Sequence, residues 1–108
     1  MLEIHVIENK DDPATRVPDG SGDFESGSWN VAIPKAERLV AEGGSFYLHS
    51  AKTAPSHWGG TAVGYRVQEQ APSEGKIVFR FRPRADHKDC VTALEGWGQE
   101  RKYVGFDD

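Results

Sequence analysis

The chain has 108 residues, which is enough for a single domain with one hydrophobic core. Hydrophobic residues make up 37% of it, and its 12 glycines and 6 prolines favour a loop-rich β or α+β domain over a helical bundle. No apolar run is long enough to cross a membrane and the N-terminus lacks the pattern of a signal peptide, so we expect a cytoplasmic monomer with no membrane partner.

The formal net charge of −4 argues against a strongly basic nucleic-acid-binding protein, but the charge is unevenly distributed. Residues 1–28 contain seven acidic and two basic residues, whereas residues 76–103 contain seven basic and four acidic ones. Because salt screens charges that are more than about 10 Å apart, one basic face could still attract phosphate. The composition therefore does not exclude nucleic acid as a partner.

The first third of the chain begins with a clear strand pattern. Residues 2–7 alternate between apolar and polar side chains and predict a half-buried strand. Residues 8–28 are rich in Asp, Pro, Gly and Ser and predict a loop of about 20 residues. Pro34 suits the first turn of a helix and Gly43 a helix end, so residues 35–42 are predicted to form a short helix.

A strand, a loop and a second strand are predicted over residues 46–68. The loop carries unusually many polar and aromatic side chains before Gly59 and Gly60, namely Ser50, Lys52, Thr53, Ser56, His57 and Trp58. Loops that are held by a rigid sheet are where binding and catalytic groups concentrate. This loop is therefore the first candidate for a functional site.

Residues 76–84 form the clearest strand pattern of the chain. Ile77, Phe79 and Phe81 are predicted to face the core, and the opposite face carries Lys76, Arg80, Arg82 and Arg84. This basic stripe could follow a phosphate backbone, or it could be a solvated face that pairs with acidic groups on neighbouring strands. Residues 103–106 predict a last strand or a packed terminus.

Three tryptophans, Trp29, Trp58 and Trp97, lie beside small residues rather than inside apolar runs. An aromatic face can stack on a nucleobase for about 1–3 kcal/mol, so each ring is a candidate ligand contact. Trp58 is the best of the three because of its predicted loop position, whereas a tryptophan in the position of Trp29 is more often a core residue.

Metal and catalytic patterns are sparse. His87 and the only cysteine, Cys90, would supply half of a metal site, and we expect neither a metal nor another cofactor. A hydrolase built on Ser50 or Ser56 with His49 or His57 is chemically conceivable, but no nucleophile-elbow pattern accompanies these residues. No catalytic residue is assigned, and an activity is not expected.

Three segments, Ser28–Ala32, Ser45–Lys52 and Gly59–Val67, together resemble the core of the PUA-like superfamily, and most closely its EVE-type domains. The resemblance lies in three features of such domains: a Trp at the start of a strand, a short helix that carries a Lys, and a Gly-rich segment that leads into a strand. The resemblance covers residues 28–68. It implies an α+β fold for residues 1–108: a small, strongly curved β-barrel of about five to six strands with one or two short helices.

The resemblance also implies a pocket that receives a flipped or single-stranded, often modified, base. Trp29 would lie at the pocket edge, and residues 50–52 with Trp58 would close over the base. We therefore expect nucleic acid or a modified nucleoside as the partner. The expected ligand-binding residues are Trp29, Asn30, His49, Ser50, Lys52, Ser56, His57, Trp58 and Trp97, and the expected phosphate contacts are Lys76, Arg80, Arg82 and Arg84.

Two alternatives stay open. ASCH-type relatives of this superfamily resemble small amidohydrolases that use Lys, Thr and Glu, and Lys52 and Thr53 with Glu37 or Glu69 could match that set. The chain could also be a protein-interaction domain.

Overall fold

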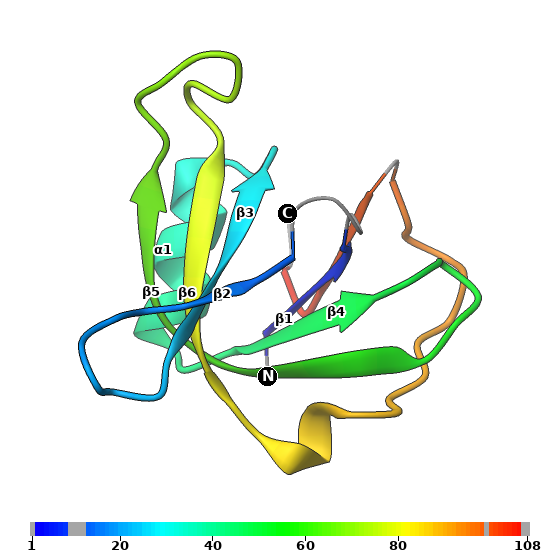
Figure 1. The fold of residues 1–108 in the computed structure, drawn as a ribbon. Coiled ribbons are helices and arrows are strands. Elements are labelled where there is room, and N and C mark those ends of the chain that lie inside the picture. The colour runs from blue at the N-terminus through cyan, green and yellow to red at the C-terminus, as the bar shows by residue number, and fades with distance from the viewer. Residues whose placement is uncertain (1, 9–12, 99, 107–108) are drawn as a thin grey trace.

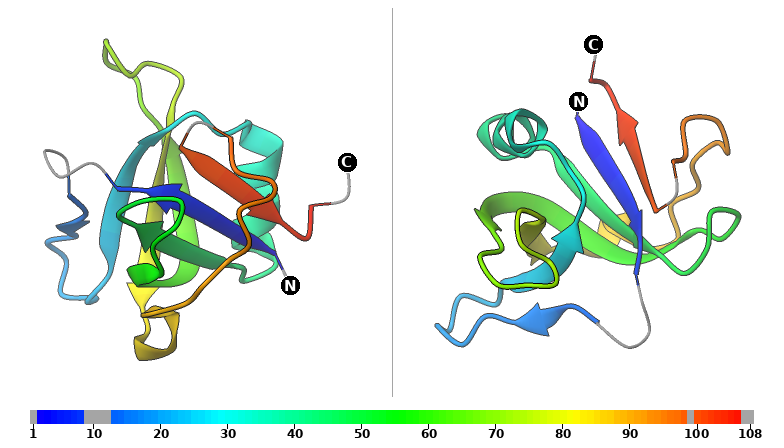
Figure 2. Two further views of the ribbon diagram at one scale, coloured as in Figure 1. Left: turned by 90° about the vertical axis from the view of Figure 1, so that its right-hand side faces the viewer. Right: turned by 90° about the horizontal axis from the view of Figure 1, so that it is seen from above.

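A computed structural model describes residues 2–8, 13–98 and 100–106. The strands are β1 (Glu3–Ile7), β2 (Thr15–Arg16), β3 (Phe24–Trp29), β4 (Ser45–His49), β5 (Ser56–Val67), β6 (Ile77–Pro83) and β7 (Arg101–Val104). The helix α1 (Ile33–Ala41) and the 3₁₀ turn η1 (Ala85–His87) complete the fold. The strands form one sheet in the order β2-β3-β6-β5-β4-β1-β7, which Figures 1 and 2 show from three sides.

The predicted closed β-barrel with five to six strands is wrong. The fold is mostly β, and its seven-stranded sheet is open, with β2 and β7 at its two edges. The sheet is mixed, because β1 and β4 run parallel and the other neighbouring strands run antiparallel. In the described part of the chain no ladder joins β2 to β7, and β2 offers only two residues for pairing.

The predicted core face of β6 is confirmed, and the apolar sides of β1 and β4 are buried together with it. Ile4, Phe46, Phe79 and Phe81 are fully buried, and Phe46 packs against both of the other phenylalanines, with ring centroids 5.1 and 5.5 Å apart. One face of each strand contributes to this core, but β1 is not half-buried as predicted, because His5 on its other face is also buried, at 2% exposure.

The predicted helix is also confirmed. α1 has Pro34 in its first turn, ends before Gly43 at φ 63°, and buries Ala36 and Leu39. It packs against β5 and β6, as Figure 1 shows. Among the described residues, no helix is long and apolar enough to span a membrane.

Two predicted boundaries are wrong. The range 8–28 contains β2 and most of β3, because the backbone of β3 pairs with β6 although residues 25–28 are small or polar. β5 begins at Ser56, so residues 56–60 belong to a strand rather than to the predicted loop. Pairing with neighbouring strands outweighs the local turn preference in both places.

The middle of β5 is unusually close to its two neighbours. A Cβ atom on Gly59 would lie 2.1 Å from the carbonyl oxygen of Phe46 in β4. A Cβ atom on Gly60 would lie 1.9 Å from the carbonyl oxygen of Arg82 in β6. Neither position can therefore hold a side chain unless the backbone moves.

We predict that Phe79→Ala lowers the free energy of unfolding by about 3–5 kcal/mol, because it leaves a cavity between Phe46 and the sheet. Val91→Ala is the control, since Val91 is 83% exposed and its truncation removes little buried surface. Chemical denaturation of both variants measures the difference. A loss below about 1 kcal/mol for Phe79→Ala would place this ring outside the core.

Candidate functional site

The half-buried rings of Trp58 and Phe24 lie over the buried ring of Phe81, and we call these three residues the aromatic surface. Trp58 contacts both phenylalanines edge to face, with centroid distances of 4.8 Å to Phe24 and 5.1 Å to Phe81. The three rings come from β5, β3 and β6. Trp58 was expected on an exposed loop, but β5 holds it and Phe81 supports it from below.

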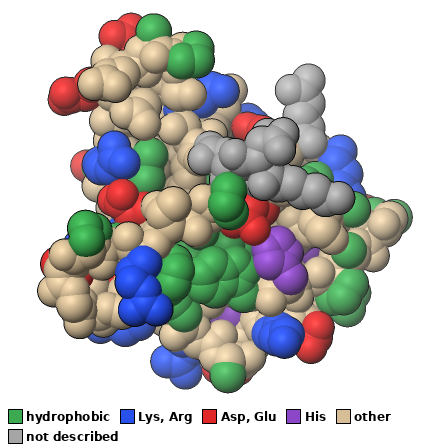
Figure 3. Space-filling view, viewed as in Figure 1, with side chains coloured by type: hydrophobic (Ala, Val, Ile, Leu, Met, Phe, Trp, Pro, Cys, Tyr) green, Lys and Arg blue, Asp and Glu red, His purple; other side chains and the backbone are tan. Residues whose placement is uncertain are grey.

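Polar groups border the aromatic surface. Figure 3 shows hydrophobic side chains gathered in the middle of one face, between a basic side chain and a histidine. The exposed Arg16 on β2 has its guanidinium carbon 5.3 Å from the centroid of Phe24. His57, next to Trp58 in β5, is 40% exposed. The rings thus have the cation of Arg16 beside them and an imidazole adjacent to Trp58 in the sequence.

Glu8 fixes the position of His57. Its Oε1 lies 2.7 Å from His57 Nε2, and its Oε2 accepts a hydrogen bond of 2.8 Å from the backbone N–H of Ala14. Glu8 follows β1 and Ala14 precedes β2, so this carboxylate joins the connection between β1 and β2 to the distant strand β5.

His49, another predicted ligand residue, lies on the opposite face of the sheet in a buried chain of hydrogen bonds. The carbonyl of Ala54 can only accept, so His49 Nδ1 donates to it, and His49 Nε2 lies 2.8 Å from His5 Nδ1. His5 Nε2 lies 2.8 Å from Glu3 Oε1. Burial lowers the pKa of both imidazoles, and the hydrogen bond with Glu3 opposes this at His5. His49 therefore has a structural partner on each ring nitrogen.

Trp97 covers these histidines rather than the aromatic surface. Its ring meets His49 edge to face at 5.4 Å and His5 at 6.4 Å. The segment around Trp97 is held by the buried Lys102, which donates to Thr92 Oγ1 and to the carbonyl of Ala93. The Trp97 indole N–H is buried and has no hydrogen-bond partner among the described residues.

The other predicted ligand residues lie apart from the aromatic surface. Trp29 is a core residue at 5% exposure, and its indole N–H donates to Ser26. Ser56 is buried and donates to the carbonyl of His87. Asn30 and Ser50 are exposed and Lys52 is half-buried. The three tryptophans thus lie in three separate environments.

The basic stripe on β6 is largely paired with acidic groups. The buried Asp23 accepts from Arg80 Nε at 2.7 Å and from Arg82 Nε at 3.0 Å, and Arg80 also donates to Asp19. Hydrogen bonds from these arginines hold the pKa of the Asp23 carboxyl below its usual value. Arg84 pairs with Asp86, and Lys76 is half-buried. The paired arrangement is the second of the two interpretations that the sequence left open.

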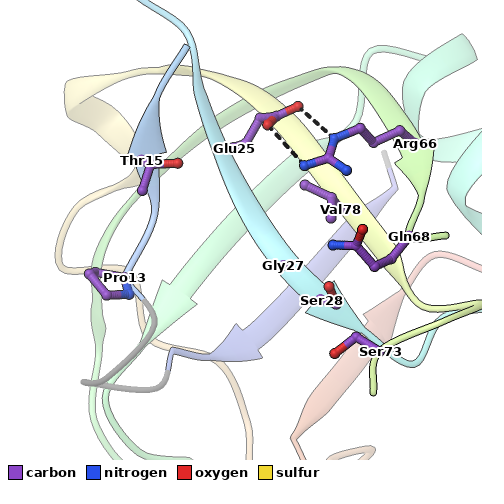
Figure 4. A pocket seen from close by; sticks show the side chains of 9 residues that line it. All are labelled: Pro13, Thr15, Glu25, Gly27, Ser28, Arg66, Gln68, Ser73 and Val78. Carbon is purple, nitrogen blue, oxygen red and sulfur yellow. Dashed lines mark hydrogen bonds and ion pairs between the residues drawn. The ribbon is translucent and has the colours of Figure 1, made fainter. Parts of the chain in front are cut away.

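A polar pocket that sequence analysis missed lies beyond this network. Its volume is about 250 Å³, and Pro13, Thr15, Glu25, Gly27, Ser28, Arg66, Gln68, Ser73 and Val78 line it (Figure 4). Arg66 donates to both carboxylate oxygens of Glu25, at 3.2 and 3.3 Å. Because these two charges neutralise each other, the pocket does not indicate a charged ligand.

His87 and Cys90 do not point to a metal site. In the described part of the chain, no three His, Cys, Asp or Glu side chains are grouped so that they could hold a metal ion. His87 instead lies between Asp86 and Ser45, and the Cys90 thiol donates to the carbonyl of Asp86.

We predict that Asp23→Asn lowers the free energy of unfolding at pH 7 by about 1.5–3 kcal/mol. The substitution replaces the buried carboxylate by a neutral amide, which weakens the hydrogen bonds from Arg80 and Arg82. The depressed pKa of Asp23 means that this stabilisation is complete above the unfolded-state pKa of about 3.9 and is lost as the pH falls through the lower folded-state pKa. Denaturation measured from pH 7 to pH 2 should therefore bring the two proteins closer in stability. A constant difference across this range would contradict a charged role for Asp23.

The geometry thus brings Trp58 and His57 together with Phe24, Arg16 and Glu8, which sequence analysis did not single out. The last three were missed because their positions in the site depend on the pairing of β3 with β6 and on contacts between segments that are distant in sequence. No protein-family profile, curated protein or solved structure matches this chain. The resemblance to EVE-type domains therefore stays a prediction.

Proposed function

We propose that the protein binds a nucleobase of single-stranded nucleic acid or of a modified nucleoside on the aromatic surface. The observation that carries this proposal is the pair of half-buried rings, Trp58 and Phe24, held edge to face by β5 and β3, the two strands that flank β6. A base that stacks on one ring contacts the other at its edge, and each stacked base contributes about 1–3 kcal/mol.

The polar groups near the aromatic surface could bind the base edge and the phosphate of a nucleotide whose base stacks on the rings. The His57 imidazole and the Glu8 carboxylate offer hydrogen-bonding atoms of the kind that recognise base edges. Arg16 is exposed beside Phe24 and can meet a phosphate group, which a cation on a flexible side chain attracts.

The charge distribution favours a short ligand over a duplex. Arg80 and Arg82 already share Asp23, so a phosphate backbone would have to compete with a buried carboxylate for them. Arg84 also pairs with Asp86, and the net charge of −4 opposes the approach of a long phosphate backbone. We infer moderate affinity that depends more on base stacking than on salt.

The structure gives less support to the alternative of an amidohydrolase that uses Lys52 and Thr53 with Glu37 or Glu69. The Tyr65 hydroxyl lies 3.4 Å from Glu37 Oε1 and donates to it. Among the described residues, no hydrogen bond or ion pair joins Lys52 or Thr53 to Glu37 or Glu69. The groups that such a mechanism would need are not in hydrogen-bonding contact.

We predict that Trp58→Ala weakens binding of single-stranded oligonucleotides by about 1–3 kcal/mol and that Trp58→Phe recovers part of this loss, because a smaller ring still stacks. Calorimetric titration with oligo-dT and oligo-dA measures both. Phe106→Ala is the matched control, because Phe106 is another half-buried ring but packs on Tyr103. Its affinity should equal that of the wild type.

Trp58→Ala should also lower stability, since Trp58 packs on Phe81. Titrations therefore belong at a temperature at which every variant is folded by circular dichroism. Equal affinities of wild type and folded Trp58→Ala, or no binding by the wild type, would refute the proposal.

A further inference from the structure

We propose that Ser45, His87 and Asp86 form a second, catalytic site that hydrolyses small carboxylic esters. The site goes beyond base binding and uses none of the three residues of the aromatic surface. Ser45 and Tyr47 are on the face of β4 that carries His49, whereas the aromatic surface lies on the face that carries Phe46 and Leu48.

The hydrogen bonds of His87 have the arrangement of a serine-hydrolase triad. Its Nε2 lies 2.9 Å from Ser45 Oγ, and its Nδ1 lies 2.7 Å from Asp86 Oδ1. A carboxylate can only accept, so Nδ1 carries the proton of the neutral ring and Nε2 is free to accept the proton of the serine hydroxyl. This is the tautomer that a general base needs, whatever the order of the three residues in the sequence.

The imidazole is held in this position from several sides. The ring of Tyr47 stacks on His87 with centroids 4.7 Å apart, and His5 stacks on the other face of Tyr47 at 4.5 Å. Ser56 Oγ donates to the carbonyl of His87 at 2.7 Å, and the His87 backbone N–H donates to Arg84. A catalytic base has to be oriented before the reaction, and these contacts supply that orientation.

Arg84 keeps Asp86 in its charged form. Its Nε and Nη2 donate to the two oxygens of Asp86, at 3.3 and 3.4 Å. These hydrogen bonds, and the one with His87, lower the pKa of the Asp86 carboxyl. The carboxylate therefore stays ionised and can stabilise an imidazolium that forms at His87.

Ser45 is only 6% exposed, and it lines a pocket through which a substrate would have to reach it. The volume of this pocket is about 340 Å³, at the small end of the range for ligand sites, and Gly43, Ser45, Tyr47, Thr61, Arg84, Asp86 and His87 line it. Thr61 is the partner of Ser45 across β5 and β4, so both side chains are on the same face of the sheet. The Thr61 and Tyr47 hydroxyls are donors that can stabilise an oxyanion. The polar lining suits a small ester rather than a lipid.

The reaction follows from these positions. Ser45 Oγ attacks the ester carbonyl carbon while His87 Nε2 takes its proton, and the carbonyl oxygen becomes the oxyanion. The intermediate collapses, the bond to the alcohol oxygen breaks, and the alcohol leaves with the proton from His87. Water then attacks the acyl group on Ser45 with His87 as base, which releases the carboxylic acid and restores the serine. The net reaction consumes one ester and one water and yields one acid and one alcohol.

A fluorophosphonate probe tests this site, because it reacts with an activated serine and stays attached. Incubation of the full chain with the probe, followed by mass spectrometry of the intact protein and its peptides, should place one phosphonyl group on Ser45. The initial rate of p-nitrophenyl acetate hydrolysis is the second readout. Ser45→Ala and His87→Gln should abolish labelling.

Asp86→Asn is the decisive variant, because the Asp86 side chain is 65% exposed and its replacement leaves the core intact. We expect labelling and hydrolysis to fall by roughly 10²- to 10⁴-fold, as when a triad loses its carboxylate. Ser26→Ala is the matched control, since Ser26 is a buried serine outside the pocket. It should be labelled at the wild-type rate.

A purely structural role for the Ser45–His87 hydrogen bond predicts different results. Absence of a label on Ser45 in the folded wild-type protein would overturn the proposal. So would a label on Ser45 that forms at the same rate in the folded Asp86→Asn variant. If Ser45→Ala or His87→Gln does not fold, the comparison of wild type with Asp86→Asn still decides.

Discussion

The close approach of three strands at Gly59 and Gly60 is the constraint on which the rest of the structure depends. Figure 1 shows β5 lying beside β4 in its first half and beside β6 in its second. Where β5 passes from one neighbour to the other, which we call the crossover, both β4 and β6 pair with Gly60. The Cα of Gly60 aligns with those of Phe46 and Pro83. Because a Cβ here would lie within about 2 Å of a carbonyl oxygen, only glycine lets the sheet continue through this point.

Both proposed sites flank this crossover, on opposite faces of β5. Trp58 precedes it and packs with Phe24 and Phe81 on the core side of the sheet. Thr61 follows it and faces outward beside Ser45, where η1 brings His87. The position of η1 depends on the same strand, since the backbone N–H of Arg84 donates to the carbonyl of Gly59. One strand can thus present an aromatic surface on one face and a polar pocket on the other.

Local patterns were enough to predict those elements that bury one face, and not those that depend on distant partners. β1 and β6 alternate clearly, and α1 lies between Pro34 and Gly43, so each has a signal in its own residues. The start of β5 combines polar residues with two glycines. This composition is also typical of a turn, so the sequence predicted a loop there. Closure of the sheet depends on whether its edge strands meet, and no local pattern records that. The Ser45–His87 contact joins residues 42 positions apart and was missed for the same reason.

The stability of Gly60→Ala relative to Gly64→Ala tests this account most directly. Both glycines lie in β5, but a Cβ on Gly64 would meet its nearest neighbour, Arg80 Cβ, at an ordinary 3.7 Å. Denaturant unfolding should show that Gly60→Ala loses about 3 kcal/mol or more, or does not fold, because its Cβ would overlap backbone that cannot retreat. Gly64→Ala should stay within about 1 kcal/mol of the wild type or exceed it, since alanine restricts the unfolded chain. Equal stabilities of the two variants would contradict the central role given to the crossover.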